Sequence, residues 1–143
     1  MGRIIAIANQ KGGVGKTTTS INLSACIAAK GKRVLVIDID PQGNTTSGYG
    51  IEKNELENTI YELILGDCSI EDCILKEVLP NISILPSNVN LAAAEIELIG
   101  VEKKEFILKN EVDWVKDRYD FIIIDCPPSL NLLTVNAMTT ADS

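Results

Sequence analysis

The sequence predicts a doubly wound α/β fold, in which a mostly parallel sheet carries helices on both faces. Three observations support this prediction. Short apolar runs alternate with longer helix-compatible stretches along the chain. These runs are continuous and rich in β-branched residues, which is typical of strands that are buried on both faces. Aromatic residues make up only 4% of a chain that is 45% hydrophobic, so aliphatic side chains must fill the core.

The first third of the chain gives one strand–helix–strand unit. The apolar run 4–8 is predicted to be a buried strand that ends at a glycine-rich turn. A helix is expected over 17–30, because the composition suits a helix and Gly31 can end it. A second buried strand is expected over 33–38, and the polar segment 39–50 should form turns.

The remaining elements are shorter. Thr59 is a predicted N-cap for a helix that runs through Leu65 and ends at Gly66. The run 70–79 is ambiguous, and a short helix is the preferred interpretation. After these, strands are expected at 82–85 and 121–125. Helices are expected at 91–99, 105–117 and 131–138. This pattern would place another strand after Ser143, so we expect 1–143 to be the N-terminal portion of a single domain.

Charge and composition exclude several classes of function. Thirteen basic and twenty acidic residues give a net charge of −7, and a surface of that sign repels a phosphate backbone. The chain has no histidine and no C-x-x-C pair, so a zinc site is not expected. The first apolar run is too short for a signal peptide or a membrane span, which favours the cytoplasm.

The cysteines and the tryptophan are expected to be structural. Cys26 and Cys126 should be small buried thiols in a helix and in a post-strand turn. Cys68 and Cys73 could form a disulfide in an oxidising compartment, although the expected cytoplasm favours thiols. Trp114 is spaced from neighbouring valines as a packing residue on a helix.

A glycine-rich loop between the first strand and the first helix is the strongest chemical motif. Its residues are Lys11, Gly12, Gly13, Val14, Gly15, Lys16, Thr17 and Thr18. Glycines let several backbone N–H groups converge on one phosphate, and the helix N-terminus attracts the same anion. Lys16 is placed to reach the β- and γ-phosphates of ATP, and the Thr17 hydroxyl to bind Mg²⁺. The alternative is a turn that only joins strand to helix, which the Gly-Lys-Thr sequence disfavours.

Lys11 departs from the ordinary P-loop pattern. The pattern G-x-x-x-x-G-K-S/T would need glycine at position 10, where this chain has Gln10. Lys11 could be a surface lysine. Beside a phosphate-binding loop it is better interpreted as an added cation for the charge on a transferring phosphoryl group. The form K-G-G-x-G-K-S/T is that of the deviant Walker A family.

Three acidic residues follow buried strands. Asp125 ends an isoleucine-rich strand, where P-loop proteins place an acid that holds magnesium, usually through water. Asp38 and Asp40 form D-x-D at the end of the second strand, and residues two apart share one face. One of these two carboxylates is expected to act on magnesium, for which Asp38 is the candidate, and the other to orient or activate the attacking water. The alternatives are a solvent-facing cap for Asp125 and turn capping by Asp40 ahead of Pro41.

Three motifs in order resemble the ParA/Soj family of chromosome- and plasmid-partitioning ATPases. They are Asn9–Thr19, Asp38–Gly48 and Asp125–Ser129. The resemblance implies a P-loop fold and an ATP-dependent homodimer in which Lys11 crosses to the partner's nucleotide. It also implies that Lys16 binds phosphates, that Thr17 binds magnesium, that Asp40 supports hydrolysis and that 125–129 acts as a switch.

The resemblance also implies partners and a location. ATP-bound dimers of the family bind DNA non-specifically on the nucleoid, and a ParB-type centromere-binding protein stimulates hydrolysis. Members continue beyond Ser143, and their DNA-contacting residues and part of the adenine pocket lie there. Asn131 stands where many members have glycine, which affects the local turn.

Two other functions compete with partition. One is a nucleotide-switched protein that positions a membrane or division complex, as MinD-like relatives do. The other is a redox ATPase similar to the nitrogenase iron protein, for which Cys126 would be the cluster ligand. The segment Asp40–Asn44 is more similar to partition proteins than to either alternative.

Overall fold

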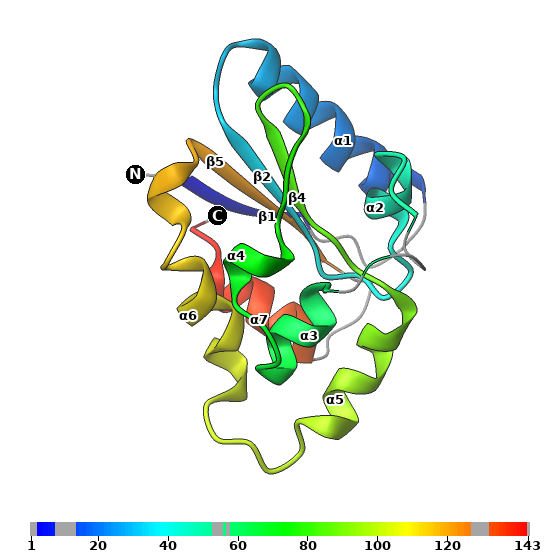
Figure 1. Ribbon diagram of the computed structural model, residues 1–143, viewed down its shortest axis with the longest axis vertical. Coiled ribbons are helices and arrows are strands. Elements are labelled where there is room, and N and C mark those ends of the chain that lie inside the picture. The colour runs from blue at the N-terminus through cyan, green and yellow to red at the C-terminus, as the bar shows by residue number, and fades with distance from the viewer. Residues whose placement is uncertain (1–2, 8–13, 53–55, 57, 127–131, 143) are drawn as a thin grey trace.

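The computed structural model describes residues 3–7, 14–52, 56, 58–126 and 132–142, with the backbone alone at 14–18 and 95. Its strands form one sheet in the order β1-β5-β2-β4-β3 (Figure 1). Their bounds are β1 Arg3–Ile7, β2 Val34–Asp38, β3 Leu75–Leu79, β4 Ile82–Leu85 and β5 Phe121–Asp125. All pairings are parallel except that of β3 with β4. The predicted mostly parallel sheet is confirmed.

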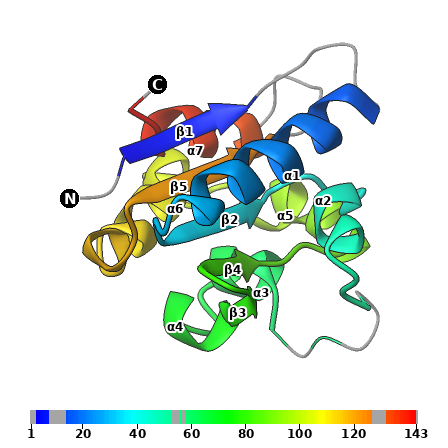
Figure 2. The same ribbon diagram turned by 90° about the horizontal axis from the view of Figure 1, so that it is seen from above.

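Helices cover both faces of the sheet, as expected for a doubly wound fold (Figure 2). The α-helices are α1 Val14–Ala29, α2 Asn44–Gly48, α3 Ile60–Leu65, α4 Ile70–Cys73, α5 Ala94–Glu97, α6 Ile107–Val112 and α7 Leu132–Thr140. Short 3₁₀ helices span Val89–Ala93, Lys104–Phe106 and Lys116–Arg118. The helix α1 packs on one face, and α3, α6 and α7 pack on the other. Within the described residues, no helix combines the length and the apolar character that crossing a membrane requires.

The central strand β2 shows why its sequence is continuously apolar. Val34 and Val36 pack with Ala28 of α1 on one side of the sheet. Leu35 and Ile37 belong to the larger cluster on the other side. Because successive side chains point to opposite faces, a strand between two helical layers has no polar face.

The predicted cap of α3 is confirmed. The Thr59 hydroxyl accepts a hydrogen bond from the backbone N–H of Tyr61. The Glu62 carboxylate accepts one from the backbone N–H of Thr59, at 2.8 Å, which completes a capping box. Gly66 ends the helix at φ 83°, in the left-handed region that glycine adopts readily.

The prediction of a helix over 70–79 is wrong in its second half. The chain forms α4 only to Cys73, and then turns into the antiparallel edge strand β3. Glu77 and Asn81 adopt positive φ around the β3–β4 hairpin. The edge position explains the ambiguous pattern, because β3 is partly exposed and carries Lys76 and Glu77 among apolar residues.

Other elements differ in extent from the predictions. The expected helices at 91–99 and 105–117 are broken into 3₁₀ and α-helical pieces. The segment 39–50 contains the short helix α2, where only turns are predicted.

Expectations for four side chains are wrong. Cys26 is exposed, because the buried stripe of α1 follows Ser20, Ser24 and Ala28. Trp114 is 78% exposed and does not pack in the core. Cys68 and Cys73 are joined by a disulfide, whereas thiols are expected in a reducing compartment. The expectation for Cys126 is confirmed, since its side chain is buried and takes no part in a disulfide.

Candidate functional site

Two aspartates lie side by side at the carboxyl ends of neighbouring strands. Asp38 ends β2, Asp125 ends β5, and the two residues are paired in register. Both continue the side-chain alternation that faces α1, as Val36 and Ile123 do. Their exposed fractions are 0% and 1%. Two buried carboxylates therefore share one edge of the sheet, which is where open α/β sheets bind ligands.

The Asp38 carboxylate is held by three hydrogen bonds. Its Oδ2 accepts from the backbone N–H of Thr46 at 2.9 Å and from the Thr46 hydroxyl at 2.6 Å. Its Oδ1 accepts from the backbone N–H of Asp40 at 3.1 Å. The pKa of Asp38 is raised to about 6, chiefly by burial; the hydrogen bonds from Thr46 lower it, and the charge of Asp125 contributes to the rise. The site therefore favours a cation or a proton at this carboxylate.

Helix α2 presents two consecutive threonines to the two carboxylates. The Thr45 hydroxyl donates to Oδ2 of Asp125, and the adjacent Thr46 donates to Asp38. Both threonines are fully buried. The helix follows Gly43, whose φ of 64° turns the chain back across the strand ends. Sequence reasoning assigns no role to these threonines, although the run Thr45-Thr46 after D-x-D was available as a signal.

Asp40 lies beyond the end of β2 and caps a turn. Its Oδ1 accepts from the backbone N–H of Gln42 at 3.0 Å across Pro41, and its carbonyl accepts from the N–H of Gly43 at 2.8 Å. This is the turn-capping alternative described above. The side chain is nevertheless only 5% exposed and lies two residues from Asp38. It is therefore held at the same edge of the sheet.

Ser87 connects this loop to a third strand. Its backbone N–H donates to the Thr46 hydroxyl at 3.1 Å, and its own hydroxyl donates to the Asp40 carbonyl at 2.8 Å. Ser87 lies just after β4, and it is fully buried. The sequence contains no motif that indicates Ser87. Its only signal is its position after a predicted strand.

The first turn of α1 lies at this same edge. The helix begins at Val14, so its backbone carries Gly15, Lys16 and Thr17 into the first turn. Figures 1 and 2 show this end of α1 beside α2 and the strand ends. The side chains of residues 14–18 lie outside the described part of the structure.

Contacts along α1 fix α2 against it. The hydroxyls of Tyr49 and Ser24 are hydrogen-bonded to each other. A Cβ at Gly48 would meet the Cδ1 end of the Ile21 side chain, so the two helices are in close contact at this position.

Part of the predicted site falls outside the described residues. Lys11, Gly12 and Gly13 do so, as do Asn131 and the switch residues after Cys126. The described residues contain no group of three or more His, Cys, Asp or Glu side chains arranged for a metal ion. Asp38 and Asp125 thus supply two oxygen donors, which suit Mg²⁺, but they do not enclose an ion by themselves.

Comparisons with known proteins agree with the fold. The AAA domain family AAA_31 matches residues 2–143. The chain is 56% identical to the sporulation initiation inhibitor protein Soj of Bacillus subtilis. That alignment covers all of this chain and 56% of the length of Soj. The chain is 46% identical to the chromosome partitioning protein ParA of Caulobacter vibrioides, over 99% of the chain and 54% of that protein.

A solved structure extends the comparison. Cobyrinic acid a,c-diamide synthase from Mycobacterium smegmatis, with bound ATP analog and magnesium, superposes with a TM-score of 0.94 at 39% identity. The match covers 99% of this chain and 57% of that one. The chain therefore spans about half the length of the relatives that it matches.

Proposed function

Because the chain belongs to the ParA/Soj family of partition ATPases, we propose that it is the nucleotide-binding portion of an ATPase that acts in chromosome or plasmid segregation. The observation that carries this proposal is the buried pair Asp38 and Asp125, held by α2 beside the start of α1. A P-loop enzyme needs an acidic edge of this kind next to its phosphate loop.

We propose that the site takes ATP with Mg²⁺. The loop residues 11–18 would hold the phosphates through backbone N–H groups and the Lys16 ammonium. Thr17, Asp38 and Asp125 would hold the ion, directly or through water. The bound ion supplies positive charge that offsets the charge of the phosphates. The raised pKa of Asp38 supports the assignment, because a cation would relieve the unfavourable burial of two neighbouring carboxylates.

The remaining roles concern hydrolysis. Asp40 would orient the attacking water, since it is held at the same edge by the turn at Pro41. Lys11 would stabilise the developing charge on the phosphoryl group of a partner subunit's nucleotide.

Assembly and partners follow from the family. We propose an ATP-dependent homodimer that binds DNA non-specifically on the nucleoid and responds to a ParB-type protein. The net charge of −7 disfavours contact between this portion and a DNA backbone. The proposed DNA contacts would therefore lie in the part of the relatives that this chain does not span.

The test compares two lysines of the loop in the full protein. Binding of a fluorescent ATP analogue and release of phosphate are measured for Lys16→Ala, Lys11→Ala and the exposed control Lys32→Ala. We expect Lys16→Ala to abolish nucleotide binding, and Lys11→Ala to bind nucleotide but fail to dimerise or hydrolyse. Lys32→Ala should behave as the wild type. Equal loss of nucleotide affinity in both loop variants would contradict a role for Lys11 across the dimer.

A further inference from the structure

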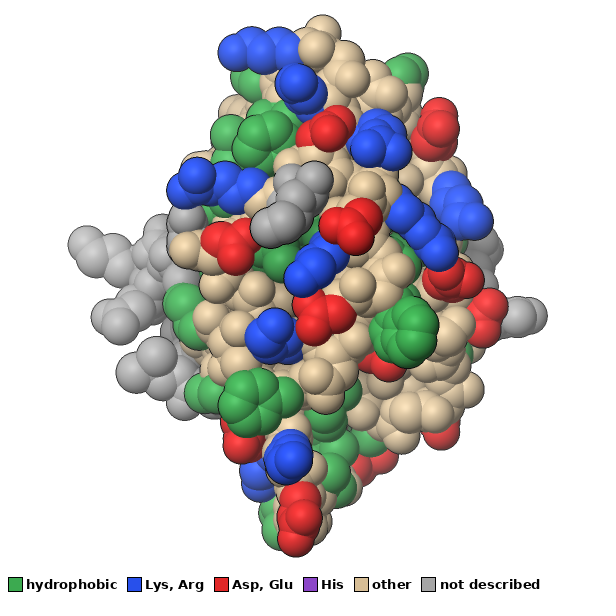
Figure 3. Space-filling model, turned by 90° about the vertical axis from the view of Figure 1, so that its left-hand side faces the viewer, with side chains coloured by type: hydrophobic (Ala, Val, Ile, Leu, Met, Phe, Trp, Pro, Cys, Tyr) green, Lys and Arg blue, Asp and Glu red, His purple; other side chains and the backbone are tan. Residues whose placement is uncertain are grey.

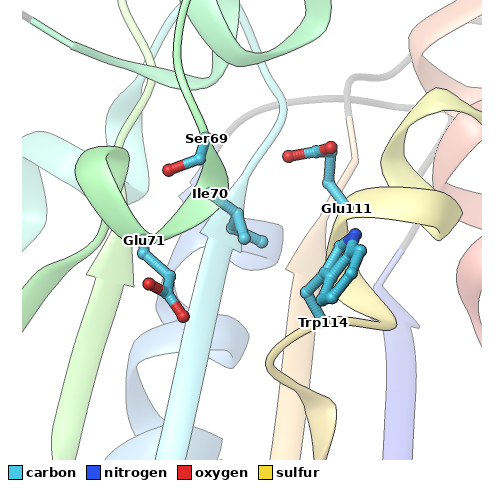
Figure 4. Close-up of a pocket in the computed structure, with 5 residues that line it drawn as sticks. All are labelled: Ser69, Ile70, Glu71, Glu111 and Trp114. Atoms are coloured by element: carbon cyan, nitrogen blue, oxygen red, sulfur yellow. The ribbon is translucent and has the colours of Figure 1, made fainter.

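A groove lies between α4 and the end of α6, on the face of the sheet opposite α1. It is lined by Ser69, Ile70, Glu71, Glu111 and Trp114 (Figure 4). The first three residues come from the start of α4, and the last two from α6 and the turn after it. Ile70 is 1% exposed and forms an apolar floor. The groove is separate from the proposed nucleotide site, which lies at the strand ends facing α1.

Trp114 is the unusual component of this groove. Its side chain is 78% exposed, and it is the one tryptophan in the sequence. Figure 3 shows exposed hydrophobic side chains among mixed acidic and basic ones on the side of the molecule where α6 lies. An indole on such a surface offers a large rigid contact area, and tryptophan is enriched among the residues that dominate binding energy.

The charges around the indole favour a cationic ligand. Glu71 and Glu111 flank the groove. Within the part of the chain that the structure describes, the Glu111 carboxylate makes no hydrogen bond and no ion pair. Glu71 is paired with Arg118. The nearest lysines of α6 and the following turn, Lys109 and Lys116, both pair with Asp113. The two lysines are therefore engaged with Asp113, and Arg118 is engaged with Glu71 at one side of the groove, so the Glu111 carboxylate beside the indole remains available.

We propose that this groove binds an arginine side chain presented by a peptide segment of a partner protein. The aliphatic stem would lie on Ile70, and the guanidinium would stack on the Trp114 indole within reach of Glu111. Arginine fits better than lysine, because its planar group stacks on an aromatic face and bonds a carboxylate at the same time. The overall charge of −7 adds long-range attraction for a basic segment.

A second copy of the chain is a less suitable occupant. A stable protein–protein interface buries about 800 Å² on each partner. Five lining residues around one indole suit a short peptide segment better than a globular surface of that size.

The experiment uses a matched pair of peptides and the full protein. An acetylated peptide with the sequence Gly-Ser-Leu-Arg-Leu-Ser-Gly is titrated to millimolar concentration by calorimetry. The same peptide with citrulline in place of arginine keeps the shape and removes the charge. We expect the arginine peptide to bind more tightly than the citrulline peptide by about fivefold or more.

Two variants and two controls locate the binding. Trp114→Ala and Glu111→Gln should each weaken binding of the arginine peptide by about threefold to tenfold. Ile99→Ala, at a side chain that is 73% exposed elsewhere, and Glu102→Gln should leave it unchanged. Circular dichroism melting checks that each variant is folded.

Three results would overturn the proposal. They are no detectable binding of the arginine peptide, equal binding of the citrulline peptide, and binding that Trp114→Ala leaves unchanged. Sedimentation that shows self-association of the wild type, lost in Trp114→Ala, would assign the groove to a second copy and equally reject the peptide ligand.

Discussion

Asp38 and Asp125 occupy equivalent positions at the ends of two neighbouring parallel strands, where both carboxylates are buried on the same face of the sheet. Each carboxylate accepts a hydrogen bond from the hydroxyl of one threonine of α2. An arrangement that buries two carboxylates side by side is unfavourable for folding and suited to binding a cation.

The first prediction concerns pH. The folded-state pKa of Asp38 is about 6, above its usual 3.8, so the folded protein binds more protons than the unfolded chain between these values. The free energy of unfolding should therefore fall as pH rises from about 4 to about 6. In the absence of magnesium and nucleotide, this fall in the free energy of unfolding should be at most about 3 kcal/mol. The Asp38→Asn variant should not show it.

Urea unfolding from pH 4 to pH 7.5 measures the effect. Asp117→Asn, at an exposed acid, is the control and should follow the wild type. Identical pH profiles for Asp38→Asn and the wild type would show that Asp38 does not titrate in this range.

The second prediction concerns Thr46, which links two strand ends. Thr46→Val removes the hydroxyl that donates to Asp38 and accepts from the N–H of Ser87. A buried donor and a buried carboxylate each lose a partner, so we expect destabilisation by about 2 kcal/mol or more. Thermal melting compares this variant with Ser47→Ala, an exposed neighbour that should change stability little. A Thr46→Val protein as stable as the Ser47→Ala control would show that the network does not hold the loop.

The third prediction concerns the cap of α3. Thr59→Ala removes the side chain that accepts from Tyr61 N–H and should cost about 1 kcal/mol. Ser69→Ala is the matched control, because Ser69 stands at the N-cap of α4 without a side-chain cap bond. Chemical denaturation should give a larger loss for Thr59→Ala than for Ser69→Ala. Equal losses would mean that the capping box contributes nothing specific.

Four strands could be predicted from the sequence to within one residue at either end, because a buried strand between two helical layers requires a continuous apolar run. β2 is the clearest case, since none of its side chains is exposed. The limits of α3 were also predictable, because Thr59 and Gly66 act through local backbone geometry. Features of this kind depend on residues that are close in sequence.

The missed features depend on distant residues. The sequence of α2, Asn-Thr-Thr-Ser-Gly, has low helix propensity, and its threonines are bound by Asp38 and Asp125, the latter 80 positions away from Thr45. Ser87 joins the site only because β4 lies beside β2. Trp114 has the spacing of a core residue, but the helix ends before it and leaves the indole outside.

The most direct test of the central claim is a crystal structure of the full protein with Mg²⁺ and a non-hydrolysable ATP analogue. The account predicts that the triphosphate lies on the backbone N–H groups of residues 12–18, with the ion between Thr17 and the carboxylates of Asp38 and Asp125, directly or through water. A nucleotide bound elsewhere, or an ion remote from both carboxylates, would contradict it.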